Sequence, residues 1–183
     1  MTLAEIIRTR RSIRCYQERA VPDALVLEIL DLARHAPSSM NDQPWCFVVI
    51  RSSQTKRRLA AAKNAHCPSE KGAAYPADFL ATAPVVIAVC VDQRRAHERA
   101  RENGILATAF LLLAAHSCGL GGVYLSAYQP RGDALALEIR RLLGLPPEIE
   151  PVTLVPLGYP AETPAPKTLR PLAELLRRES VAP

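Results

Sequence analysis

The chain has 183 residues, of which 49% are hydrophobic and 22% are charged, values typical of a packed globular protein and not of a disordered one. Its length suits a single domain over residues 1–183. Lys and Arg total 23 against 18 Asp and Glu, a formal net charge of +5. Basic and acidic residues are interspersed, so no nucleic-acid partner is expected, and the positive excess suits an anionic cofactor or substrate.

The N-terminus and the cysteines indicate a cytoplasmic protein. The first fifteen residues are charged and lack the apolar segment of a signal peptide. The longest apolar run, within residues 104–118, is shorter than the roughly 20 residues of a membrane span, so no membrane partner is expected. The five cysteines are scattered without C-x-x-C spacing, and the four histidines show no ligand spacing either. We therefore expect reduced thiols, no disulfide framework and no metal site.

Two helices and a polar loop are predicted for the first 45 residues. A capping box at residues 2–5 starts a helix that runs toward residue 10. Pro22 opens a second helix with a broad apolar face. Pro37 stops this helix, and a polar loop follows as far as Trp45.

From residue 46 onward, short apolar strands alternate with helices. Strands are expected at 46–50, 85–91, 123–127 and 152–158. Helices are expected at 54–65, 94–118 (with a break near 103–104), 133–143 and 172–178, and a loop at 67–76. The stretch from Ile105 to Ala115 is apolar nearly all round, which indicates burial between subunits. These elements predict one α+β domain with a sheet of four or five strands wrapped by helices.

The segment Arg10-Arg11-Ser12-Ile13-Arg14 suits the binding of a phosphate. Each arginine presents a planar fork of donors that matches phosphate oxygens, and the serine hydroxyl adds a neutral donor. The alternative is that these arginines only solvate the end of the first helix, where the helix dipole favours cations.

A second polar segment, Pro37-Ser38-Ser39-Met40-Asn41-Asp42-Gln43-Pro44-Trp45, follows the second helix. It lies between prolines and has too little apolar surface to belong to the core. Its hydroxyl and amide groups are of the kind that bind ring carbonyls and ring nitrogens. A solvated turn is the alternative. Together with the arginine segment, this loop indicates a site for a phosphorylated heteroaromatic cofactor.

These two motifs resemble those of the FMN-dependent nitroreductase family, and the similarity extends over essentially the whole chain. It includes the strand at 85–91, the apolar helix, the turn Gly119-Leu120-Gly121-Gly122 and the tail that begins at Gly158-Tyr159-Pro160. The resemblance implies a three-layer fold with a central mixed sheet and an intertwined homodimer. It also implies hydride transfer from NADH or NADPH through flavin N5 to an electron-poor small molecule such as a nitroaromatic or a quinone.

The resemblance further implies which residues hold FMN at the subunit interface. Arg14 would lie near the pyrimidine end of the flavin ring and tune its electrostatics. The implied contacts to the phosphate and ribityl chain are Arg10, Arg11, Ser12, Lys167 and Arg170. The implied contacts from the partner subunit are Pro37, Ser38, Ser39 and Asn41. The implied backbone contacts near N5 and O4 are Leu120, Gly121 and Gly122.

No protein acid, base or nucleophile is expected, because the flavin would carry the chemistry. Three alternatives stay open at this point. One is another flavin reaction on the same scaffold, such as dehalogenation or flavin breakdown. A second is a non-catalytic flavin-binding or regulatory protein. The third is a thiol redox sensor at Cys15, since a neighbouring cation such as Arg14 favours the thiolate.

Overall fold

The computed structural model describes residues 1–66, 76–129 and 132–179, so nearly all of the predicted loop at 67–76 lies outside the described residues. Its centre is a five-stranded sheet in the order β1-β2-β5-β3, with β4 also paired to β5. The strands are β1 (Trp45–Ile50), β2 (Val85–Asp92), β3 (Gly121–Gly122), β4 (Leu125–Ser126) and β5 (Ile149–Gly158). These pairs are antiparallel, and an isolated bridge between Ser12 and Gly122 adds a parallel contact.

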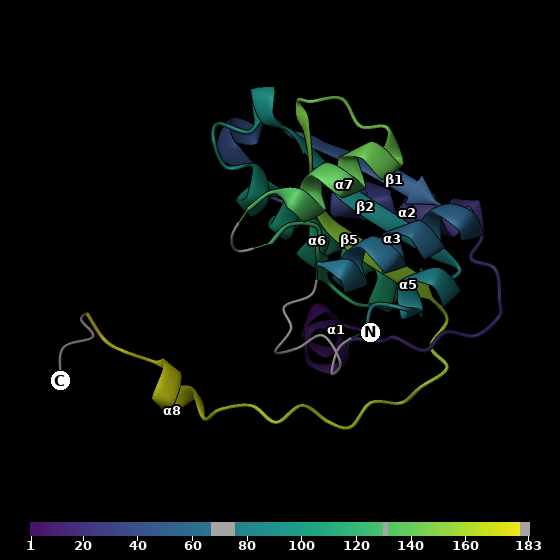
Figure 1. Ribbon diagram of the computed structural model, residues 1–183. Helices are drawn as coiled ribbons and strands as arrows, with labels where there is room; N and C mark the ends of the chain where they lie inside the picture. The colour runs from purple at the N-terminus through teal and green to yellow at the C-terminus, as the bar shows by residue number, and fades with distance from the viewer. Residues whose placement is uncertain (67–75, 130–131, 180–183) are drawn as a thin grey trace.

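Helices cover both faces of the sheet (Figure 1). The first face packs against α2 (Asp23–Ala33) and α6 (Ala100–Ser117). The second face packs against α3 (Ser53–Ala65), α5 (Phe79–Thr82) and α7 (Ala134–Leu143). Successive side chains of a strand point to opposite faces, so β2 serves both cores. Its residues 85, 87 and 89 belong to the first core and 86, 88 and 90 to the second. The predicted three-layer α+β fold is confirmed.

The N-terminal segment and the tail meet at one end of the sheet. Helix α1 (Leu3–Thr9) begins at the predicted capping box, with Thr2 accepting from the amide of Glu5. The chain then runs past the end of β5, where Tyr16 pairs with Pro160. Beyond this pairing the tail first follows the N-terminal segment, where Glu162 bonds the amide of Cys15 and Ala165 bonds Arg11. It then leaves the body and carries the short helix α8 (Leu172–Leu175) away from it (Figure 1).

Three predicted elements differ from the structure. Helix α6 continues through Asn103, and the break comes earlier, after the 3-10 turn η2 (Gln93–Arg95), where residues 97 and 98 have φ of 49° and 60°. Of the strand predicted at 123–127, only Leu125–Ser126 is a strand, β4, while β3 lies just before the predicted range. Pro156 on β5, opposite the gap between β3 and β4, has no amide hydrogen for the ladder. The last helix ends at Leu175 instead of residue 178, since none of its residues is buried and a short helix without packing is only marginally stable.

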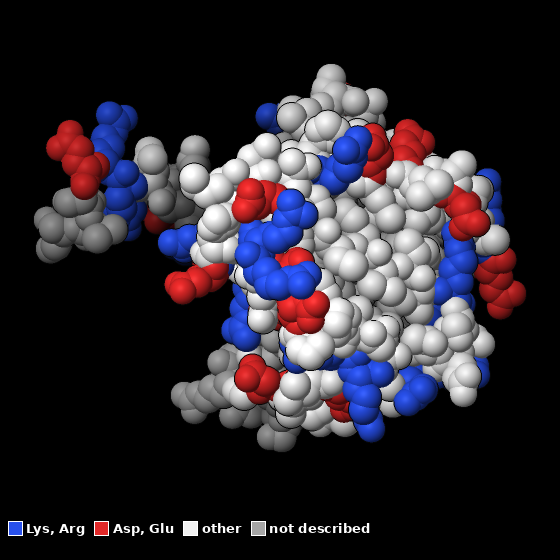
Figure 2. Space-filling model, turned by 90° about the horizontal axis from the view of Figure 1, so that it is seen from above, with Lys and Arg blue, Asp and Glu red and all other residues white. Residues whose placement is uncertain are grey.

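On the face seen from above, described side chains of both charge signs are mixed and form no large patch of one sign (Figure 2). Figure 2 also shows a broad uncharged area between them. None of the helices in the described residues is long and apolar enough to cross a bilayer.

Candidate functional site

Two cations of the predicted phosphate site line one cavity at the end of α1. Arg10 directly follows the helix, and Lys167 approaches it from the tail. The cavity has a volume of about 500 Å³, and its remaining lining comes from Tyr124, from Ile7 of α1, and from Ile105, Ala109, Leu112 and Leu113 of α6. The site therefore combines a cationic end with an apolar wall.

Like charges raise the electrostatic energy of this cluster. Burial lowers the pKa of Arg10, and the neighbouring Arg11 lowers it further. Burial, then Arg10 and Arg11, likewise lower the pKa of Lys167. No salt bridge found between described residues involves any of these three side chains. A bound anion would offset this mutual repulsion.

Arg11 has a structural task that its sequence motif does not show. Its Nη1 donates to the carbonyl oxygens of Arg8, Arg10 and Thr9, at 2.9, 3.1 and 3.3 Å, and so satisfies the C-terminal end of α1. Its Nε donates to the carbonyl oxygen of Ala165 at 3.4 Å, which ties the tail, two residues before Lys167, to the N-terminal segment. Arg11 thus positions the cluster as well as adding charge to it.

The glycine turn lies beside Ser12 at the end of β5. Ser12 pairs with Gly122, and the amide of Ile13 donates to the carbonyl oxygen of Gly122 at 3.1 Å. A Cβ at Gly121 would lie 2.5 Å from Ile13, and one at Gly122 would lie 2.6 Å from Leu157. Internal packing therefore accounts for both glycines, whether or not a ligand approaches them. Leu120, predicted with them, is 1% exposed.

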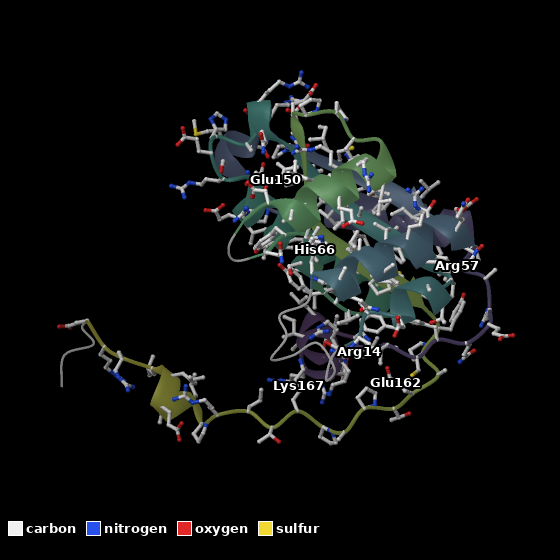
Figure 3. All side chains as sticks on the ribbon, in the orientation of Figure 1. Arg14, Arg57, His66, Glu150, Glu162 and Lys167 are labelled. Atoms are coloured by element: carbon white, nitrogen blue, oxygen red, sulfur yellow. The ribbon has the colours of Figure 1, made fainter. Side chains whose placement is uncertain are left out.

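Arg14 is half-buried next to a carboxylate that the motif did not reveal. Its amide and that of Cys15 both donate to Oε1 of Glu162, the second at 2.9 Å. The Arg14 guanidinium lies 6.0 Å from the centre of the Phe79 ring. Figure 3 shows Arg14, Glu162 and Lys167 near one another at the α1 end of the molecule. Glu162 joins the N-terminal segment to the tail.

The polar loop after α2 is held in a defined shape by its own side chains. The Ser38 hydroxyl accepts from the amide of Gln43 at 3.1 Å, and Met40, Asn41 and Gln43 have φ of 53°, 59° and 48°. Such left-handed backbone costs free energy for residues other than glycine and is concentrated at functional sites. Pro37 and the tip residue Met40 are exposed, Met40 by 82%.

Within one chain, this loop and the Arg10 cluster lie at opposite ends of β5. The carbonyl oxygen of Pro44 accepts from Asp92, which pairs with Ile149 at the start of β5. The glycine turn pairs with Gly158 at the other end. The ten residues of β5 separate the two by roughly 30 Å. Figure 3 likewise shows Glu150, near the start of β5, far from Lys167.

Arg170 is not brought to the cluster within its own chain. Its Nε donates to Glu174 at 3.2 Å, and its side chain is 67% exposed on the segment that leaves the body. In one chain, the tail cation at the predicted site is Lys167.

Three residues at these sites were missed by the motifs. Asn103 anchors the loop through Ser39, Glu162 binds the amides after the arginine motif, and His116 bonds Thr9 near the cluster. The only signal for Asn103 was a polar residue in an apolar helix, which indicates a buried hydrogen bond. Nothing in the sequence signalled the other two, because their contacts join segments far apart in the chain.

Comparisons with known proteins agree with the fold and extend over most of the chain. The Nitroreductase family profile matches residues 7–159. A protein of Methanothermobacter thermautotrophicus, named as a candidate NADH dehydrogenase/NAD(P)H nitroreductase, is 37% identical over 92% of this chain and 83% of its own length. A solved structure with the same candidate assignment, from Bacteroides thetaiotaomicron, is 29% identical, covers 97% of this chain and 96% of its own, and has a TM-score of 0.83.

A third similar protein is an iodotyrosine deiodinase whose solved structure contains FMN and 3-iodo-L-tyrosine. It is 25% identical, covers 99% of this chain and 100% of its own, and has a TM-score of 0.79. The family profile covers well over half of the chain, and the fold agrees with these structures. The chain therefore belongs to the nitroreductase family.

Proposed function

We propose that the chain is an FMN-dependent NAD(P)H oxidoreductase that acts as a homodimer on a flat, electron-poor small molecule such as a nitroaromatic or a quinone. Family membership supports an oxidoreductase, as do relatives named for NADH dehydrogenase or NAD(P)H nitroreductase activity. The FMN in the similar iodotyrosine deiodinase structure supports the choice of cofactor.

The proposal of a flavin site shared by two chains rests on the separation of the Arg10 cluster from the Pro37–Trp45 loop. Each feature suits one part of a phosphorylated flavin, yet one chain holds them at opposite ends of β5. A flavin mononucleotide is too short to reach both, but two chains related by a two-fold axis would place the loop of one over the cluster of the other. The exposed apolar side chains of α6, Ile105, Leu106 and Phe110, supply a surface for that contact.

The residues at the cluster fit the phosphate end of FMN. Arg10 and Lys167 would bind the phosphate, Arg11 would hold the tail in place, and Ser12 would lie beside the ribityl chain. The apolar wall from α6 and Tyr124 would face the less polar part of the cofactor. Arg170 could contact the phosphate of FMN only if it reached the site of a second chain.

The chain's own groups would bind FMN, orient its ring and shield one side of it from water. When bound, FMN would supply hydride transfer between the nicotinamide donor and the acceptor. The half-buried guanidinium of Arg14 would stabilise negative charge on the ring. The Ser38, Ser39 and Asn41 groups of the partner's loop would orient the ring and exclude water from one side. A protein acid or base at this site has no required role.

An anaerobic absorbance spectrum, recorded before and after NADH and then NADPH, tests the proposal. We expect a flavin band at about 450 nm, if necessary after reconstitution with FMN, and we expect this band to bleach when one of the two donors is added. A band that persists with both donors would indicate a non-catalytic flavin-binding protein. Absence of flavin binding would overturn the proposal.

Dehalogenation needs its own test, because one similar structure is a deiodinase. The reduced protein would be mixed with 3-iodotyrosine or with a nitroaromatic, and reoxidation of the flavin followed under anaerobic conditions. We expect faster reoxidation by the nitroaromatic. Faster reoxidation by 3-iodotyrosine, with release of iodide, would assign the dehalogenation reaction instead.

A further inference from the structure

His116 lies in the last turn of α6, close to the cationic cluster but outside the predicted motifs. Its Nε2 is 2.8 Å from the hydroxyl of Thr9, the final residue of α1. It lines a cavity of about 350 Å³ together with Arg11, Gly121 and Glu162. The imidazole is therefore placed between α1, α6, the glycine turn and the tail, where the phosphate site is built.

The hydrogen bonds of Thr9 determine which nitrogen of His116 carries the proton. The Thr9 hydroxyl lies 2.7 Å from the carbonyl oxygen of Glu5, which can only accept, so its single hydrogen is used there. His116 must then donate from Nε2 to the Thr9 oxygen. The neutral ring consequently has its lone pair on Nδ1, and a second proton would be added at that atom.

Two opposite electrostatic influences act on His116. The C-terminal end of α6 favours a positive charge in its last turn. Burial lowers the pKa of His116, and Arg10, Arg11 and Lys167 lower it further by repulsion. Glu162 lines the same cavity, but its carboxylate accepts from the amides of Arg14 and Cys15. A phosphate among the three cations would cancel their repulsion and leave the favourable helix end.

We propose that His116 is a proton-linked part of the cofactor's phosphate site, in which phosphate binding beside Arg10, Arg11 and Lys167 adds a proton to Nδ1 of His116. The protonated ring then attracts the phosphate as a fourth cation and keeps its bond to Thr9. This inference rests on the proposed FMN binding. It adds a residue that makes the affinity depend on pH through the phosphate, not through the flavin ring.

The test compares FMN with riboflavin, which has the same ring and no phosphate. Dissociation constants are measured for the wild type and for His116→Gln at about pH 8 and about pH 6, on either side of the ordinary histidine pKa. Glutamine keeps a donor for Thr9 without a titrating charge. The ratio of variant to wild-type constants removes effects common to both proteins, including ionisation of the phosphate itself.

We expect this ratio for FMN to rise at least about threefold between the higher and the lower pH, since linked protonation changes affinity by up to tenfold per pH unit. For riboflavin the ratio should stay constant. An FMN ratio that does not change with pH, or a riboflavin ratio that changes equally, would overturn the role of His116 and leave the proposed function intact. A wild type that binds neither ligand would overturn both.

A second measurement on the wild type does not depend on the variant folding. The titration of His116 is followed by NMR with FMN, with riboflavin and without ligand, and its signal is identified by residue-specific assignment of the wild type. FMN should raise the pKa of His116 and riboflavin should not. Equal values in the three samples would contradict the proposal.

Discussion

The amide nitrogen and the hydroxyl of Ser39 both lie against Oδ1 of Asn103, at 3.1 and 3.4 Å. Asn103 is 2% exposed, and its Nδ2 donates to the carbonyl oxygen of Ala96 at 3.3 Å. One buried amide thus joins the polar loop to the start of α6. The loop is consequently preorganised within a single chain, before any second chain or cofactor meets it.

Asn103→Ala should loosen this loop and destabilise the protein. The substitution leaves the Ser39 amide and the Ala96 carbonyl without their buried partner, at an expected cost of about 1–3 kcal/mol in the free energy of unfolding. Ser39→Ala removes only the hydroxyl contact and should cost less. Urea unfolding of both variants measures the difference, and equal costs would show that the amide contact is unimportant.

Lys167→Ala and Arg10→Ala should each weaken FMN binding at least roughly tenfold, because each removes a charged phosphate contact worth about 1.5–3 kcal/mol. Arg170→Ala should have a smaller effect, since its guanidinium lies outside the cluster and bonds Glu174. Fluorescence titration with FMN measures all three. A larger loss for Arg170→Ala than for Lys167→Ala would place the tail cation of the site at Arg170, through a second chain.

Gly121→Ala should destabilise the protein by about 1–3 kcal/mol through overpacking against Ile13. The new Cβ would lie 2.5 Å from that side chain. Gly119→Ala is the matched control, because its φ is +77° and nothing lies within 4 Å of its Cβ position. It should cost about 1 kcal/mol from the backbone alone. If Gly121→Ala unfolds at the wild-type urea concentration, packing does not explain this glycine.

Phe110→Glu on α6 should convert the proposed dimer to a monomer and weaken FMN binding with it. Phe110 is 38% exposed on the apolar helix, and a carboxylate there would be buried without a partner in the dimer. Leu137→Glu is the control, since Leu137 is 55% exposed on α7 in the opposite helical layer. Light scattering gives the mass of each. A wild type that is monomeric at micromolar concentration would contradict the shared site.

The cofactor-free protein should lose stability as the pH falls toward 5, partly through His116. Burial and the three nearby cations lower its pKa in the folded state below the ordinary 6.5, so the unfolded chain binds the proton more strongly. This contribution is fully present above about pH 6.5 and is lost as the pH falls through the lower folded value. Urea unfolding of the wild type should show a steeper loss than that of His116→Gln, and parallel curves would exclude the effect.

Much of the fold was determined by short stretches of sequence. The capping box starts α1 as predicted, and the apolar runs at 46–50 and 85–91 are the strands β1 and β2. Such elements depend on neighbouring residues, through capping and periodicity, so the sequence alone specifies them. The same holds for the polar loop and the arginine motif as chemical groups. Their assignment to FMN stays a prediction until binding is measured.

Only the tertiary structure decided how these groups are combined. It placed the loop and the Arg10 cluster at opposite ends of β5, and it left Arg170 outside the cavity that Arg10 and Lys167 line. It also brought His116 to Thr9, 107 positions earlier in the chain. Contacts of this kind depend on strand register and helix packing between distant segments, which no local pattern encodes. The sequence by itself therefore determined the chemistry that each segment offers, and the sheet determined which segments share a site.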